Sequence, residues 1–422
     1  MRPQVQTSSQ MIDVADLPVE QAVDKIIDHA VQLGASDLFI LANEQFFSVQ
    51  MRHLGIIRPL SIVGSDQGRR FAQHIKAQAA MDVAEHRFPA DGRWIYENLP
   101  EGEDDKEQEQ HTVDLRISTI PTLYGEDMVI RLLSRNMGLF GLDELGFTDR
   151  ELASVKLMLD SPGGLILCCG PTGSGKTATL YAALRALHDG TRKINTIEDP
   201  IEFAIEGFRQ SQIRPGIDLT FGDLLKGVLR QSPDIIMIGE IRDELTARTA
   251  VHAANSGHLV LSTIHAPVAA AAIESMRSLG VNNHFLATAL RGVISQRLVR
   301  TLDPERRVEY DIEHAPEVYE PVKHLLREGE GTKFYAPGAG ENHTGYLSRT
   351  GVYEVMTMSS TLRELVASGA HTGAIRKQAL SSGMLDFKSN ALLKVARGIT
   401  SIEEVFRVIP SEYLDEDQTS DT

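Results

Sequence analysis

The chain has 422 residues, of which 42% are hydrophobic and 24% charged, a balance typical of globular proteins with two or three domains. Its 58 acidic and 42 basic residues give a formal net charge of −16, which argues against DNA or RNA as the main partner. No apolar segment has the length of a signal peptide or a membrane span, so we expect a cytoplasmic protein that meets a membrane only through partners.

The N-terminal part of the sequence predicts a flexible tail over residues 1–20 and a small α/β domain over residues 21–135. Apolar residues at helical spacing predict a helix in "PVEQAVDKIIDHAVQLG", and "DLFIL" and "FFSVQMRHLG" predict short strands. The segments "DGRWIYENL" and "HTVDLRISTIP" flank the acidic run "PEGEDDKEQEQ" and predict a hairpin with a solvated tip.

Two arginines of this domain lie on predicted strands. The alternation in "TVDLRIS" puts Arg116 on the polar face of its strand, where it faces solvent or another domain. In "EDMVIRLL", Arg131 lies inside an apolar run, where an unpaired guanidinium is unfavourable.

Beyond a linker at residues 136–146, the pattern of residues 147–302 changes to strands alternating with helices. This alternation predicts an α/β fold with a parallel, doubly wound sheet and a site at the carboxyl ends of the strands. The predicted strands are "GGLILCCG", "KINTIEDP", "PDIIMIGE" and "HLVLSTIHA". The adjacent Cys168 and Cys169 are expected to be buried on opposite faces of the first strand, without a disulfide.

The rest of the chain divides into three predicted segments. Residues 303–345 are polar and irregular, residues 346–410 form a helical region with three predicted helices, and residues 411–422 form an acidic tail. The three helices are "TLRELVASG", "TGAIRKQALSSG" and "SNALLKVARGITSIEEVFRVI".

The segment "GPTGSGKTATLYAAL" fits the phosphate-loop pattern Gly-x-x-x-x-Gly-Lys-Thr, with an apolar strand before it and a helix after it. Backbone N–H groups and the helix N-terminus hold phosphates in such a loop. Lys176 is expected to reach the β- and γ-phosphates of ATP, and Thr177 to bind Mg²⁺. The residues expected to bind ATP are Gly170, Pro171, Thr172, Gly173, Ser174, Gly175, Lys176, Thr177 and Ala178.

Two carboxylates and a histidine end the neighbouring predicted strands. "PDIIMIGE" carries Glu240 to a position expected beside the phosphate loop, where a carboxylate holds the water of a metal or orients the attacking water. "NTIEDP" adds Glu198, and either carboxylate can be the general base, although "IEDP" is equally well a capping turn. His265 ends "LVLSTIH" and can donate to a γ-phosphate, whereas an isolated histidine is more often structural.

In their order, these segments resemble the secretion ATPase superfamily that powers type II secretion and type IV pili. "INTIEDPIEF" resembles its Asp box, "RQSPDIIMIGEIRD" its Walker B segment and "GHLVLSTIHA" its His box, and the likeness covers about residues 20–410. The resemblance implies a RecA-like P-loop ATPase core, a smaller N-terminal PAS-like α/β domain and a C-terminal helical region. It also implies a Mg²⁺-dependent homohexamer that works an inner-membrane platform protein, which places the chain at the inner membrane through this partner.

The resemblance further implies roles for single residues. Glu198 is the general base, Glu240 acts near Mg²⁺ and water, and His265 senses phosphate. Arg116 and Arg131 reach the nucleotide, with Arg93 as a weaker candidate, because a planar, permanent cation neutralises charge on a γ-phosphate.

The sequence departs from the family pattern in two main ways. Assembly-type members usually bind zinc through four cysteines between "QRLVR" and "TGY", and this segment has no cysteine, so no zinc is expected. A further N-terminal docking domain is usual, whereas about 20 residues precede the matching region here. The alternatives that stay open are a pilus retraction motor and a weakly hydrolysing regulatory protein; a motor on nucleic acid is disfavoured by the charge.

Overall fold

The structure is a computed structural model that describes residues 11–97, 112–134, 140–310, 318–338, 340 and 344–414. The chain separates into two compact units. The small unit runs to residue 138 and takes in residues 340–344, and the large unit comprises residues 139–339 and 345–422. The predicted acidic hairpin loop, and parts of the predicted tails, linker and irregular segment, lie outside the described residues.

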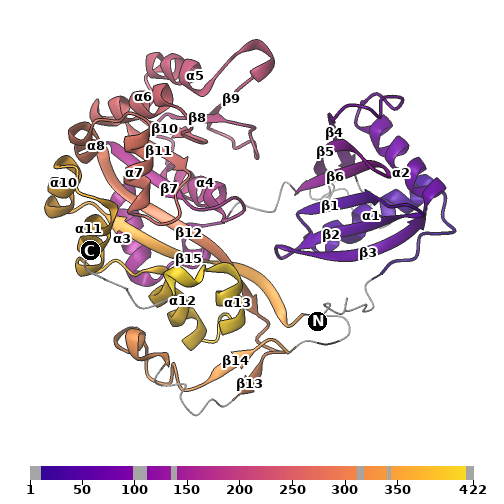
Figure 1. Cartoon of the computed structure of the whole chain (residues 1–422). Coiled ribbons are helices and arrows are strands. Elements are labelled where there is room, and N and C mark those ends of the chain that lie inside the picture. Colours follow the sequence, from indigo (N-terminus) through magenta and orange to yellow (C-terminus); the bar gives the residue numbers. More distant parts are fainter. Residues whose placement is uncertain are drawn as a thin grey trace. The chain divides into compact units, whose positions relative to one another are not determined.

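The small unit is built on a six-stranded antiparallel sheet with the order β3-β2-β1-β6-β5-β4. Two helices pack on one face of this sheet (Figure 1). The elements are α1 (Val19–Gln32), β1 (Asp37–Ala42), β2 (Phe46–His53), β3 (Ile56–Gly64), α2 (Ser65–Gln78), β4 (Ala90–Glu97), β5 (Thr112–Thr122) and β6 (Gly125–Ser134). The predicted hairpin is the β4–β5 pair.

Sequence patterns explain why some of these elements were predicted and others were not. The residues Ala22, Val23, Ile26, Ile27 and Ala30 of α1 are buried, and Gly34 follows the helix with a φ of 67°. By contrast, α2 is strongly polar and contains Gly68, where an added Cβ would lie 2.3 Å from the ring of Phe47. The tail prediction also extends too far, because Val14 is buried and Ile12 donates its N–H to the Leu60 carbonyl oxygen at 2.8 Å.

The large unit contains a seven-stranded sheet with the order β15-β12-β7-β11-β10-β8-β9, parallel except for β15 (Figure 1). The strands are β7 (Gly164–Cys169), β8 (Ile194–Glu198), β9 (Arg209–Gln212), β10 (Ile235–Ile238), β11 (Leu259–Ile264), β12 (Leu290–Leu302) and β15 (Tyr346–Thr357). Every residue of β7, β8, β10 and β11 is buried, as expected for strands covered on both faces.

Helices cover both faces of this sheet, which confirms the predicted α/β class. One face packs on α3 (Asp149–Leu159) and α4 (Lys176–Leu187). The other face packs on α5 (Phe221–Val228), α6 (Glu244–Asn255), α7 (Ala271–Ser278) and α8 (Asn283–Ala289). Cys168 and Cys169 are buried in the two different cores.

The C-terminal region differs from the predicted helical subdomain. Residues 346–357 form β15, a strand of the large sheet, and the helices that follow bury Leu362 and Ile375 in the same core as the parallel strands. The third predicted helix is two helices, because Gly398 has a φ of 65° and the Ser401 side chain caps a new helix. The helices are α10 (Ser360–Ala367), α11 (Thr372–Ser381), α12 (Phe387–Ala396) and α13 (Ile402–Val408).

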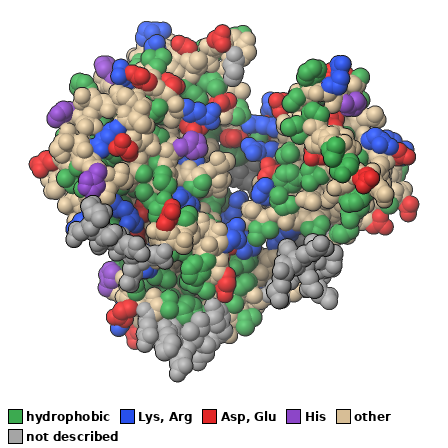
Figure 2. Space-filling model, in the orientation of Figure 1, with side chains coloured by type: hydrophobic (Ala, Val, Ile, Leu, Met, Phe, Trp, Pro, Cys, Tyr) green, Lys and Arg blue, Asp and Glu red, His purple; other side chains and the backbone are tan. Residues whose placement is uncertain are grey.

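The predicted irregular segment contains short regular elements within its described part. β13 (Val308–Tyr310) pairs with β14 (Phe334–Ala336), and a 3-10 helix spans Glu320–Leu325. Within the described ranges, no helix combines the length and the apolar character that crossing a membrane needs. Acidic and basic side chains are interspersed on the face shown in Figure 2, so the net charge is not gathered into one patch there.

Candidate active site

The phosphate loop joins β7 to α4 at the carboxyl end of the parallel strands. Gly170, Gly173 and Gly175 have φ values of 144°, 76° and 89°, which residues other than glycine rarely adopt. The first N–H groups of an α-helix have no partner within the helix. In α4 no side chain caps them either, because the N-cap residue is Gly175. A glycine-rich loop that leads into such a turn binds phosphate well.

Lys176 lies within this loop. Its Nζ donates to the carbonyl oxygens of Gly170 and Pro171 at 2.9 and 3.0 Å. Burial lowers the pKa of the Lys176 ammonium, and the charge of Glu240 acts in the opposite direction. The Glu240 carboxylate thus favours the charged form of Lys176. Thr177, the next residue, is exposed.

Glu240 and His265 meet at the same edge of the sheet. Glu240 lies two residues beyond β10 and His265 directly follows β11, and these strands are parallel neighbours. The His265 Nε2 lies 2.7 Å from one carboxylate oxygen of Glu240, and the Arg242 guanidinium lies 2.6 Å from the other. His265 is 61% exposed, so its ring can reach a bound ligand.

The order of the strands adds a detail that was not predicted. β11 lies between β7 and β10, so His265 ends a strand that pairs directly with β7, and Glu240 follows the strand beyond it. Strand order depends on long-range packing, and no motif in the sequence reports it. Arg242 was also not predicted, although it follows Glu240 by two residues in "IGEIRD".

Glu198 occupies a different setting at the end of β8. Its side chain is 3% exposed and accepts hydrogen bonds from the Tyr181 hydroxyl, from Thr196 Oγ1 at 2.5 Å and from Gln210 Nε2 at 3.1 Å. Burial, and then the neighbouring Glu198 charge, raise the pKa of the Tyr181 hydroxyl above its ordinary value. Because Tyr181 lies on α4, Glu198 connects β8 to the helix that begins at the phosphate loop.

The arginines of the small unit lie in one row across its sheet. Arg93 is paired with Arg116, Arg116 with Arg131, Arg131 with Asp37, and Asp37 with Arg52, each directly opposite on the next strand. We call Arg52, Arg93, Arg116 and Arg131 the arginine row. Neighbouring positions on the same strands are buried against α1 and α2, so the row lies on the other face.

Two aspartates neutralise part of this charge. Asp114 accepts two hydrogen bonds from Arg93, both of 2.8 Å, and Asp37 lies 3.4 Å from both Arg131 Nε and Arg52 Nε. Arg131 is 60% exposed and paired, so the unfavourable burial considered from the sequence does not arise.

Like charges directly opposite each other destabilise a sheet, and three consecutive positions of the row carry arginine. Planar guanidinium groups at this spacing favour an anion with several oxygens, such as a phosphate chain. Arg52 was not among the predicted residues. Its membership depends on the register of β1 and β2, which the sequence pattern does not fix across strands.

Comparison with known proteins adds independent evidence. A family model described as "Type II/IV secretion system protein" matches residues 13–407. The type II secretion system protein E of Xanthomonas campestris pv. campestris is 40% identical, over 93% of this chain and 68% of its own length. The type IV pilus assembly ATPase PilB of Pseudomonas aeruginosa is 35% identical, also over 93% and 68%.

A solved structure agrees in fold. The X-ray structure of the Legionella pneumophila ATPase DotB superposes with a TM-score of 0.68 and 19% sequence identity. The match covers 94% of this chain and 98% of that one.

Proposed function

Because this chain belongs to the type II/IV secretion system protein family, a family of nucleotide-hydrolysing ATPases, we propose that it is a hexameric motor. In this proposal ATP hydrolysis drives the assembly of a pilus or pseudopilus, or type II protein secretion, through an inner-membrane platform protein. One observation carries it: the phosphate loop with Lys176 and the contact between Glu240 and His265 lie at the carboxyl edge of one parallel sheet.

The phosphates of ATP are bound by backbone N–H groups of residues 170–178 and by the N-terminus of α4. Lys176 exchanges its bonds to the loop carbonyl oxygens for the β- and γ-phosphate oxygens. His265 ends the strand beside the loop and donates to the γ-phosphate, so it reports whether that phosphate is present.

The donor set at this edge suits Mg²⁺, which prefers oxygen ligands and keeps several of its waters. Thr177 offers an exposed hydroxyl in the first turn of α4, and Glu240 offers a carboxylate that acts through a water. A bound Mg²⁺ would neutralise charge on the phosphate oxygens. No zinc site is part of the proposal.

Glu198 is proposed as the general base. Its buried carboxylate is oriented by Tyr181, Thr196 and Gln210, and the Tyr181 contact ties it to the helix that holds the phosphate loop. Glu240 differs, since its carboxylate is held by the cationic side chain of Arg242 and by His265. Substitution of each glutamate by glutamine separates these two roles.

Arg116 and Arg131 are proposed to neutralise charge that develops on the phosphates during hydrolysis. Support comes from their adjacent positions in the arginine row, which concentrate positive charge on one face of the small unit. Arg93 lies next to Arg116 in the same row, and Arg52 lies beyond Asp37; both of these arginines contact an aspartate. A movement of the small unit would then be coupled to the state of the nucleotide.

Coupling to a membrane partner is tested with vesicles. We expect the ATPase rate of the purified chain to rise at least about fivefold on inverted inner-membrane vesicles that contain a platform protein of a type II secretion or type IV pilus system, because partner binding lowers a conformational barrier. Vesicles from a strain that lacks that platform protein are the matched control. An equal rate on both kinds of vesicle would contradict the proposed coupling, and the Lys176→Ala variant excludes contaminating ATPases.

A further inference from the structure

A polar side chain lies buried in β12, the strand next to the one that carries the phosphate loop. Gln296 lies in the segment "GVISQRLVRTL", shortly after the buried Val293 and Ile294, and is only 1% exposed. β12 pairs in parallel with β7, and Ser295 is opposite Cys169, the last residue before the loop. A buried amide in this position must be satisfied by protein groups or ordered water.

The Gln296 amide joins three consecutive segments of the site. Its Nε2 donates to the Ser174 carbonyl oxygen at 2.7 Å, and its Oε1 accepts from Thr179 Oγ1 at 2.9 Å. The Cys168 thiol lies 3.8 Å from the same Oε1. One side chain therefore connects the end of β7, the phosphate loop and the start of α4.

The loop approaches this residue closely. A Cβ added to Gly170 would lie 2.5 Å from the Gln296 carbonyl oxygen, and one added to Gly175 would lie 3.1 Å from Nε2. Gly170 and Gly175 are thus required for two reasons: a Cβ would come too close to Gln296, and their φ values are positive.

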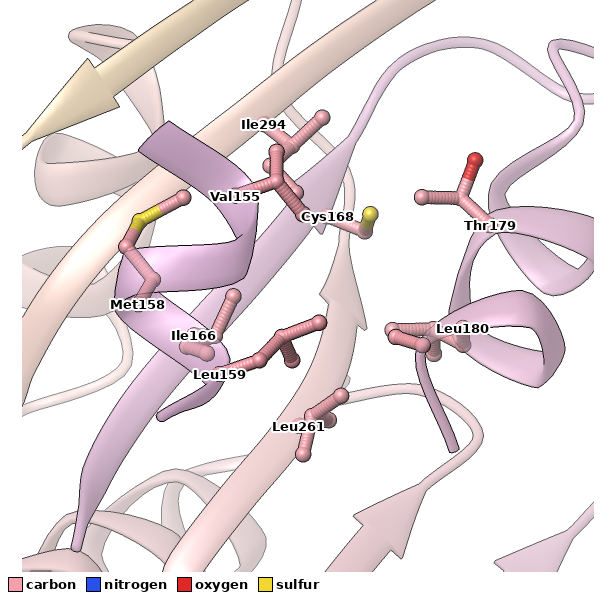
Figure 3. A pocket seen from close by; sticks show the side chains of 10 residues that line it. Val155, Met158, Leu159, Ile166, Cys168, Thr179, Leu180, Leu261 and Ile294 are labelled. Carbon is pink, nitrogen blue, oxygen red and sulfur yellow. The ribbon is translucent and has the colours of Figure 1, made fainter. Parts of the chain in front are cut away.

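The space beside Cys168 and Thr179 is small and mostly apolar. A cavity of about 10 Å³ is lined by these two residues together with apolar side chains of α3, α4, β7, β11 and β12 (Figure 3). Such a space is at the lower limit for one water molecule and offers few polar partners. The Gln296 amide is thus the protein group that bonds both the Ser174 carbonyl oxygen and the Thr179 hydroxyl.

We propose that Gln296 is a positioning residue for nucleotide binding, an inference that rests on the proposed nucleotide site. In a trans peptide the C=O and N–H groups point in opposite directions. Because Gln296 holds the Ser174 carbonyl oxygen, the N–H of Gly175 points away from β12, to the side on which the phosphates of a nucleoside triphosphate bind. Gln296 itself touches no phosphate.

The test compares nucleotide affinity with thermal stability in the full chain. Gln296→Leu keeps the approximate size and removes both hydrogen bonds, so the Kd of a fluorescent ATP analogue should rise about tenfold or more. Thr179→Val removes only the contact on Oε1 and should raise Kd less than about threefold. The double variant should have the same Kd as Gln296→Leu alone, because both substitutions act on the same hydrogen-bond network.

Ser262→Ala is the matched control. Ser262 is a buried hydroxyl on β11 that donates to the Ile238 carbonyl oxygen at 2.8 Å. Its removal should lower Tm without changing Kd. A folded Gln296→Leu variant with the Kd of wild type would overturn the inference. An equal rise in Kd for Ser262→Ala and Gln296→Leu, at an equal loss of Tm, would also overturn it, because the effect would then reflect stability alone.

Two further outcomes are distinguishable. If Gln296→Leu does not fold, Gln296→Asn is measured instead; it keeps the amide but withdraws it by one methylene, and weaker binding at an unchanged Tm is the supporting result, whereas an unchanged Kd contradicts the inference. A wild-type chain that fails to bind the analogue would contradict the proposed nucleotide site, on which the role of Gln296 depends.

Discussion

In the seven-stranded sheet the candidate functional side chains lie at the ends of strands, whereas in the six-stranded sheet they lie in a row across one face. The parallel strands are buried on both faces, so a ligand can reach them only at their ends, and the phosphate loop, Glu240 and His265 lie at the carboxyl ends. The antiparallel sheet is covered by helices on one face, so its other face can present a continuous line of side chains. In each sheet the candidate functional side chains thus lie where no helix covers the strands.

The comparison also separates two kinds of chemistry. The strand ends combine a lysine, carboxylates and a histidine, which can bind phosphates and activate water. The arginine row has permanent cations, partly neutralised by Asp37 and Asp114, so it can stabilise negative charge but cannot exchange protons near neutral pH. Substitutions of these strand-end side chains should therefore remove activity, and those of the arginine row should reduce it.

The largest effect is expected for Lys176→Ala. Loss of the cation from the phosphate loop should reduce ATP hydrolysis by about a thousandfold, measured as phosphate release. Lys193→Ala is the control, because Lys193 precedes β8 at the opposite end of the same sheet. Comparable activity of the two variants would break the assignment of function to the carboxyl edge.

Glu240→Gln should come next. Without the carboxylate, turnover should fall about a hundredfold while the Kd for ATP changes little, because the phosphate loop is intact. Turnover and Kd are measured on the same preparation. Glu244→Gln, on the exposed ion pair of Glu244 with Arg248, should behave as wild type. A rate of ATP hydrolysis equal to that of wild type in Glu240→Gln would show that Glu240 has no catalytic role.

Arg116→Ala and Arg131→Ala test the other half of the comparison. Each should lower the turnover of the assembled protein by about tenfold or more, because a cation that stabilises developing charge is lost. The Kd for ATP of the monomeric full chain should change little in either variant, because the phosphate loop is intact. Arg69→Ala removes an exposed arginine of α2, on the helix-covered face, and is the matched control. A hexamer of Arg116→Ala with wild-type activity would exclude that residue.

The smallest effect is expected for Glu354, a buried residue that contacts the segment after His265. Glu354 on β15 accepts the Ala269 N–H at 2.9 Å in the segment after His265, and burial raises the pKa of this carboxyl from 4.5 to about 7. Between these pH values the folded chain holds a proton that the unfolded chain releases, so stability falls as pH rises through this window.

Glu354→Gln should therefore gain stability relative to wild type between pH 5 and pH 8, on the order of 2 kcal/mol in the free energy of unfolding by urea. The glutamine oxygen can still accept from Ala269. The exposed Glu403→Gln substitution should leave the pH dependence unchanged. Parallel stability profiles for Glu354→Gln and wild type would show that the carboxyl does not titrate in this window.

The two sheets also differ in how far the sequence reveals them. Local patterns predicted the phosphate loop and the strands that lead to Glu198, Glu240 and His265, because each motif lies within a few consecutive residues. The order of those strands was not predicted, since β11 enters between β7 and β10 through long-range packing.

In the small unit, β3 and α2 were missed because Pro59 interrupts the strand pattern and few apolar residues mark the helix. The arginine row was only partly predicted, because Arg52 joins it through the register of β1 and β2. The role inferred for Gln296 likewise needs the three-dimensional neighbourhood of the phosphate loop.

The most direct test of the central claim is the rate of ATP hydrolysis with and without Mg²⁺, measured together with molar mass by light scattering on the wild-type chain. We expect Mg²⁺-dependent hydrolysis in fractions with the mass of six chains. A protein of that mass with no hydrolysis, even on vesicles that contain the platform protein, would contradict the account of the carboxyl edge as the active site of a motor.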